Sequence, residues 1–133
     1  MIELDDAFYE EIVEQARSEL PNEACGVIAG KEGRAARRYP MRNVDESPLT
    51  YRFDAKEQYR VMSEIEDEGL ELWAIYHTHT HTEAYPSPTD VERAGYPEWW
   101  YLIVTLKGEA PMLRAYRIVD GQIKEDSITL EAP

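Results

Sequence analysis

The three histidines of the chain alternate at positions 77, 79 and 81, directly after a very apolar segment. In an extended strand, successive side chains point to opposite faces, so His77 and His79 project to one side and Thr78 points away. Zinc prefers tetrahedral nitrogen, sulfur or oxygen ligands, and a catalytic zinc takes three from the protein and leaves the fourth position to water. The spacing therefore predicts two ligands of a zinc site.

Asp90 is the candidate for the third ligand. A polar loop with two prolines separates it from His79, and such a loop can fold back and bring a carboxylate beside the imidazoles. Ser87, Pro88 and Asp90 also form the pattern of a helix start, with an N-cap serine, a first-turn proline and an acid at the third position. A zinc ion held in this way lowers the pKa of a bound water from about 16 towards about 7.

The series His77, His79, Ser87 and Asp90 resembles the signature of the JAMM/MPN+ zinc metallopeptidases. That motif includes an upstream glutamate, and the segment around Glu23 is similar to the place where the family carries it. The resemblance implies that Glu23 is the general base and acid, and not a metal ligand. It also implies that the Ser87 hydroxyl stabilises the oxyanion of the tetrahedral intermediate, in addition to capping the helix. Without the resemblance, Glu23 would be interpreted as a solvated acid after a proline.

Three neighbouring residues receive no part in the reaction. His81 has the parity of the other histidines, but the family motif has no ligand at that position. Cys25 is expected to be a packed thiol, because no free histidine remains to activate it. Thr78 is expected to orient the loop through hydrogen bonds.

The composition narrows the class of protein. A length of 133 residues predicts one domain, residues 1–133, and a net charge of −13 disfavours nucleic acid and anionic membranes as partners. A basic or neutral protein partner fits better. The single cysteine and the lack of a signal stretch indicate the cytoplasm, and no apolar run approaches the roughly 20 residues that span a bilayer.

Hydrophobic periodicity predicts a mixed α/β domain with two long helices and about six strands. Asp5 or Asp6 can cap the first helix, which ends at Pro21 and carries its apolar residues on one face: Phe8, Ile12, Val13, Ala16 and Leu20. The second helix is expected over residues 55–68, with Tyr59, Met62 and Ile65 on its core face and Gly69 closing it. Strands are expected over residues 25–29, 34–42, 49–53, 70–76, 99–106, 112–119 and 122–130. The family resemblance implies an α/β/α sandwich similar to the cytidine-deaminase fold.

Similarity extends beyond the metal motif to a branch of the family, the small bacterial Mec-type enzymes. The segments that carry it are residues 22–30, 40–43, 47–48, 51–54, 82–87 and 117–121. The resemblance implies hydrolysis of the amide after the C-terminal Gly-Gly of a ubiquitin-like sulfur-carrier protein, which releases cysteine as a step of cysteine biosynthesis. An extended glycine tail can enter a narrow metal cleft and add to a sheet edge.

Two other functions remain open from the sequence. The same residues would serve an isopeptidase that removes ubiquitin-like modifiers from protein lysines. A non-catalytic MPN scaffold is the alternative from another class, although scaffolds of this kind usually lack motif residues that are present here. A zinc nucleoside deaminase is set aside, because its Pro-Cys-x-x-Cys ligands are absent.

Overall fold

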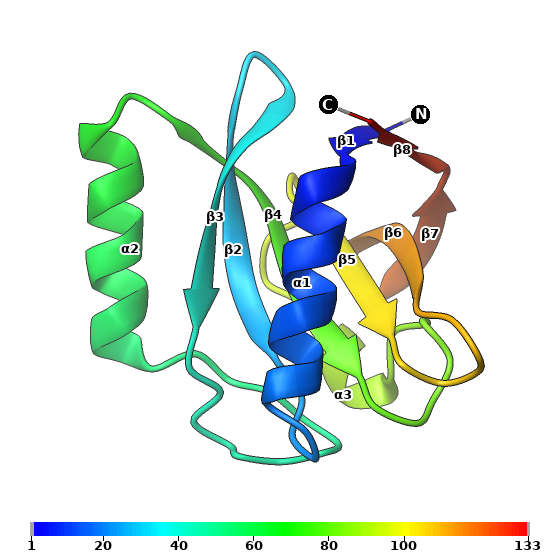
Figure 1. Ribbon diagram of the computed structural model, residues 1–133. Coiled ribbons are helices and arrows are strands. Elements are labelled where there is room, and N and C mark those ends of the chain that lie inside the picture. The colour runs from blue at the N-terminus through cyan, green and yellow to red at the C-terminus, as the bar shows by residue number, and fades with distance from the viewer. Residues whose placement is uncertain (1, 133) are drawn as a thin grey trace.

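The computed structural model describes residues 2–132, which form one six-stranded sheet, a separate two-stranded pair and three helices (Figure 1). The elements are, in order, β1 (Ile2–Asp5), α1 (Asp6–Ser18), β2 (Cys25–Lys31), β3 (Arg34–Met41), α2 (Ala55–Asp67), β4 (Glu71–His79), α3 (Pro88–Arg93), β5 (Trp100–Thr105), β6 (Met112–Val119), β7 (Gln122–Asp126) and β8 (Ile128–Glu131). The strand order in the large sheet is β3-β2-β4-β5-β6-β7. Its β4 and β5 pair in parallel, whereas the other neighbours are antiparallel.

The helices cover both faces of the large sheet. On one face, Ile12 and Val13 of α1 pack with alternate residues of the central strands, among them Tyr76. On the other face, α2 packs against β2 through Val61, and the region of α3 packs against β4 and β5. The expected α/β/α sandwich is confirmed, and the layers are visible in Figure 1, where α1 crosses in front of the sheet.

The central strands are apolar over most of their length, as expected for strands with both faces covered. Every residue of β2 from Cys25 to Gly30 is buried, and so is every residue of β4 from Trp73 to His79. Partners in the register share a face of the sheet, and Val27 pairs with Ile75, which in turn pairs with Tyr101. From Ile75 to His79, the odd-numbered residues of β4 therefore face α2 and α3, whereas a register shift nearer the start of the strand places Leu72 on that face.

Both long helices differ in detail from their predictions. The first ends at Ser18, so Leu20 lies beyond it and is 49% exposed, and Asp5 is the N-cap without a capping hydrogen bond from its side chain. The second has the predicted extent within one residue, but Tyr59 is 77% exposed. Each residue advances about 100° around a helix, so Tyr59 lies about 200° from Val61, the residue that α2 buries.

Two strand predictions also need correction, and one strand was not predicted. Residues 49–53 do not form a strand, and only Phe53 makes a bridge, to Asn43. The predicted strand over residues 122–130 breaks at Ser127 into β7, which pairs with β6, and β8, which leaves the sheet. The sequence reading missed β1, whose residues pair in parallel with β8 and bury Ile2 and Leu4 over α1.

Candidate metal centre

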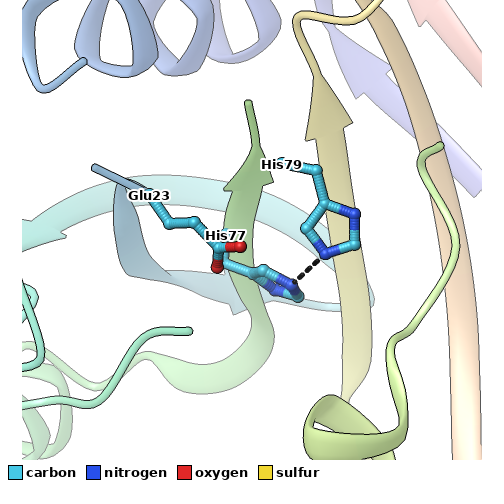
Figure 2. A group of neighbouring side chains, drawn as sticks. All are labelled: Glu23, His77 and His79. Atoms are coloured by element: carbon cyan, nitrogen blue, oxygen red, sulfur yellow. Dashed lines mark hydrogen bonds between the residues drawn. The ribbon is translucent and has the colours of Figure 1, made fainter. Parts of the chain in front are cut away.

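The strand β4 presents His77 and His79 on the face of the sheet that α2 and α3 cover. Both lie at odd positions after Ile75, and Thr78 points to the opposite face, as the alternation of the sequence predicts. Both histidines are almost fully buried, with 1% and 3% of the residue surface exposed. Their Nε2 atoms are 3.2 Å apart (Figure 2).

Asp90 reaches this pair from the first turn of α3. Its Oδ2 lies 3.1 Å from Nε2 of His77 and 3.2 Å from Nε2 of His79. The predicted helix start is confirmed: Ser87 is the N-cap, its Oγ accepts from the Asp90 N–H at 3.1 Å, and its own N–H donates to Asp90 Oδ2 at 2.9 Å. This reciprocal capping box fixes the Asp90 carboxylate against the histidines.

The three atoms form a triangle of the size that a zinc ion requires. Zinc binds histidine nitrogen and carboxylate oxygen at about 2.0–2.2 Å, so the edges of a tetrahedral ligand set are roughly 3.3 Å long. The observed edges are 3.1, 3.2 and 3.2 Å. Nδ1 of His79 is 2.7 Å from the Glu83 carbonyl, which can only accept, so this nitrogen donates and leaves the Nε2 lone pair for a metal. The donor set fits a metal ion.

The electrostatics of the triangle also suit a cation. Burial would raise the pKa of Asp90, but His77 and the hydrogen bonds from both histidines and Ser87 hold it well below its usual range, so the group is a carboxylate. Burial lowers the pKa of His77 and favours the neutral ring. For His79, burial acts in the same direction but is outweighed by hydrogen bonds to Asp90 and the Glu83 carbonyl, and the pKa is raised.

Glu23 lies beside the two histidines, just before β2 begins (Figure 2). Its carboxylate and the ligand atoms of His77 and His79 all lie within 4.8 Å of one another, and the three residues could together hold a metal ion. Glu23 is 3% exposed, and its Oε1 has no hydrogen-bond partner within residues 2–132. Burial raises its pKa to about 8, with His79 opposing and Asp90 reinforcing the shift.

This pKa predicts the pH dependence of stability of the metal-free protein. An acid whose folded pKa is raised from 4.5 to about 8 costs nothing at low pH and destabilises the fold progressively as pH rises through that window. One pKa unit corresponds to about 1.4 kcal/mol, so the cost reaches a few kcal/mol at pH 8. Thermal unfolding of metal-free Glu23→Gln and wild type, measured from pH 5 to pH 8, should therefore show a Tm difference that grows in favour of the variant. A Tm difference that stays constant from pH 5 to pH 8 would contradict a raised pKa for Glu23.

The remaining predicted residues occupy distinct places. Thr78 accepts a hydrogen bond from the Ala24 N–H at 2.8 Å through Oγ1, so it fixes the residue next to Glu23. Cys25 is buried, its Sγ lies 3.7 Å from the Met41 carbonyl, and burial raises the pKa of the thiol. His81 is exposed, and its Nδ1 lies 2.6 Å from the neighbouring Thr80 hydroxyl.

Two residues near the site received no role from the sequence. The Tyr51 ring stacks on His77, with ring centroids 4.4 Å apart and planes 20° from parallel. Asn43 is buried and binds the backbone of the segment that carries Glu23. Both lie in segments that resemble the Mec-type enzymes. The sequence could not show that Tyr51 stacks on His77 or that Asn43 binds the backbone near Glu23, because both contacts join distant parts of the chain.

The sequence around this site matches a known protein family. A family model described as prokaryotic homologues of the JAB domain matches residues 5–119. The chain belongs to this family. The matched range includes Glu23, His77, His79, Ser87 and Asp90.

Several curated relatives of this JAB-domain homologue are named as peptidases or proteases. It is 45% identical over 122 residues to the CysO-cysteine peptidase of Mycobacterium tuberculosis, which covers 90% of this chain and 84% of the relative. It is 36% identical over 118 residues to a probable TtuB-protein conjugate cleaving protease of Thermus thermophilus, with 84% of this chain and 74% of the relative covered. With the Glu/His/His cluster, these findings make the protein an enzyme of the JAMM metallopeptidase type.

Solved structures agree on the fold of the JAB-domain homologue. A protein of Desulfitobacterium hafniense, solved in solution, superposes with a TM-score of 0.89 at 33% identity and covers 100% of this chain and 94% of its own. A JAB1/MPN domain protein from Archaeoglobus fulgidus has a TM-score of 0.63 at 18% identity, covers 98% of this chain and 100% of its own, and supports the fold alone. In residues 2–132, no helix has the length and apolar character needed to cross a membrane.

Proposed function

We propose that the protein is a zinc-dependent hydrolase of carrier-protein conjugates, with His77, His79 and Asp90 as the metal ligands. The observation that carries the proposal is the buried triangle of two Nε2 atoms and one carboxylate oxygen, with edges of 3.1–3.2 Å and a second carboxylate beside it. Asp90 is assigned as the third ligand in preference to Glu23 because its Oδ2 lies 3.1 and 3.2 Å from the two imidazole nitrogens, whereas Oε1 of Glu23 has no hydrogen-bond partner within residues 2–132.

Zinc bound there would polarise the scissile carbonyl and lower the pKa of a water molecule. Glu23 accepts the proton of the attacking water at its carboxylate and passes it to the departing amine. A pKa of about 8 for the metal-free group is near the pH at which such transfers in both directions are efficient. The burial of Glu23 and of both histidines keeps bulk water away from this exchange.

The Ser87 hydroxyl is proposed to donate a hydrogen bond to the oxyanion. Its oxygen accepts from the Asp90 N–H, and within the described chain it donates to no protein group, so its proton is available for substrate. Ser87→Ala removes both the donor and the cap. We expect turnover to fall by about 10²–10³-fold, as for loss of an oxyanion donor, and stability to fall by about 1 kcal/mol.

Ser87→Gly separates the two roles. Glycine at an N-cap costs only a few tenths of a kcal/mol relative to serine, but it supplies no hydroxyl. Equal losses of turnover in the alanine and glycine variants would support direct contact with substrate. If turnover instead falls only in the alanine variant, whose Tm is lowered more, Ser87 acts only as a cap.

The proposed substrate is a ubiquitin-like sulfur-carrier protein whose C-terminal Gly-Gly is joined to cysteine. The support is the 45% identity to a CysO-cysteine peptidase along 90% of the chain. The net charge of −13 favours a basic or neutral carrier. We place this reaction in the cytoplasm, in keeping with a single cysteine that is buried and unpaired.

The second candidate is an isopeptidase that removes a ubiquitin-like modifier from protein lysines. The relative named for cleavage of TtuB-protein conjugates favours it. Intact-mass spectrometry of the zinc-loaded protein with two parallel substrates decides between the candidates: a carrier ending in Gly-Gly-Cys, and the same carrier joined through Gly-Gly to a lysine side chain. Faster loss of cysteine supports the first function, and preferred cleavage at lysine supports the second. Cleavage of neither, by protein with a full complement of zinc, would revive the non-catalytic scaffold.

A further inference from the structure

Asn43 is a buried side chain, 4% exposed, whose hydrogen-bonding positions are all filled by backbone groups. Its Nδ2 donates to the carbonyls of Glu23 and Thr50, each at 3.0 Å. Its Oδ1 accepts from the N–H groups of Asp45 and Arg52, at 3.0 and 3.1 Å. A carboxamide has two donor hydrogens and two acceptor lone pairs, so this amide is fully satisfied and its orientation is fixed by its partners.

These partners belong to two separate segments of the chain. Glu23 lies between α1 and β2, whereas the other three belong to the loop between β3 and α2. A second bond joins the same segments, because the Glu23 N–H donates to the Ser47 carbonyl at 2.8 Å. Both backbone groups of Glu23 are therefore bound to the Asn43 side chain or to the loop that it organises.

The loop carries Tyr51 between two of the Asn43 partners, Thr50 and Arg52. The Tyr51 ring stacks on His77, and Nδ1 of His77 has no hydrogen-bond partner within residues 2–132. Metal-binding histidines are usually oriented through the nitrogen that does not bind the metal, as His79 is by the Glu83 carbonyl. Nδ1 of His77 has no such hydrogen bond within residues 2–132, so the plane of the His77 ring is fixed by the stacked Tyr51 ring.

We infer that Asn43 is a positioning residue: one carboxamide sets the location of Glu23 and, through Tyr51, the plane of the His77 ring. The catalytic consequence rests on the proposed function, whereas the structural link does not. Misplacement of a reacting group by about 1 Å can cost about 10²-fold in rate, so loss of this carboxamide should affect turnover far more than binding of the carrier.

Four variants test the inference. Asn43→Ala removes all four hydrogen bonds, and Asn43→Asp keeps the acceptor for the loop but loses the donors to Glu23 and Thr50. Tyr51→Ala removes only the stacked ring. Val61→Ala is the matched control, because it truncates a side chain that is 2% exposed in the cluster under α2, outside this network.

The first readout needs neither metal nor substrate. The chain has three histidines, so its imidazole signals in a ¹H–¹³C NMR spectrum can be assigned individually. Because the Tyr51 ring is stacked on His77, we expect it to shift the His77 ring protons upfield in the metal-free wild type. We expect this shift to be lost in Tyr51→Ala and in both Asn43 variants, and to persist in Val61→Ala. An Asn43 variant that keeps the shift overturns the inference.

The second readout is turnover of the preferred carrier conjugate. Both Asn43 variants should lose about 10²-fold in kcat while KM stays within about threefold and zinc remains bound one per chain. Val61→Ala should lose no more than its lower Tm explains. Asn43 variants no worse than this control also overturn the inference. If the wild type cleaves no conjugate, the proposed function fails, and the NMR shifts alone decide whether Asn43 positions His77.

Discussion

Glu23→Gln is expected to lower turnover by about 10²–10⁴-fold, the range that a positioned general acid or base contributes. Glutamine has nearly the same shape, so it fills the buried site beside the histidines, but it cannot accept the proton of the attacking water. Because Glu23 is assigned no bond to the metal, zinc should remain bound one per chain. The measurement is single-turnover cleavage of the carrier conjugate by intact mass, with zinc determined on the same sample.

Glu92→Gln is the matched control for this prediction. Glu92 is an exposed acid on α3, two residues from Asp90, and the same change there should leave turnover within about twofold. Undiminished turnover in Glu23→Gln would remove the proposed base. If Glu23→Gln loses zinc as well as turnover, Glu23 is a metal ligand. Its position within 4.8 Å of the histidine ligand atoms allows this outcome.

The proposed general base, Glu23, differs from the other proposed site residues in how far the sequence alone predicts it. His77, His79, Ser87 and Asp90 lie in one short stretch, so strand alternation and a helix-start pattern were enough to bring them together. Glu23 is more than fifty residues away along the chain. It meets the histidines because β2 pairs antiparallel with β4, with Cys25 opposite His77. That pairing cannot be derived from local periodicity, so only the family resemblance could identify Glu23.

The errors have the same origin, since each depends on a tertiary contact that local pattern does not contain. Tyr59, Met62 and Ile65 have helical spacing, but the sheet buries Val61 and Ile65, half-buries Met62 and leaves Tyr59 exposed. Residues 49–53 have the composition of a strand, yet the Asn43 side chain binds the Thr50 carbonyl and the Arg52 N–H in place of a partner strand.

Replacement of a proposed metal ligand should greatly weaken zinc binding. His79→Ala removes one corner of the ligand triangle, and its zinc affinity should fall by on the order of 10³-fold or more, beyond the 10–100-fold that residues orienting a ligand contribute. His81→Ala is the matched control, because this exposed histidine has the same strand parity but lies outside the cluster. The measurement is thermal unfolding after chelator treatment, with and without added zinc.

The zinc-dependent gain in Tm is the decisive quantity, since it cancels the cost of the cavity that alanine leaves in the buried site. A ligand that binds only the folded state stabilises it by RT ln(1 + [L]/Kd), or about 4 kcal/mol at a thousand times Kd. Wild type and His81→Ala should show this gain in full, whereas His79→Ala should show almost none of it. If His79→Ala retains the gain, the triangle of His77, His79 and Asp90 is not where the stabilising zinc binds. Chelated wild type, which keeps every side chain but lacks the ion, should be inactive and regain turnover as zinc is restored.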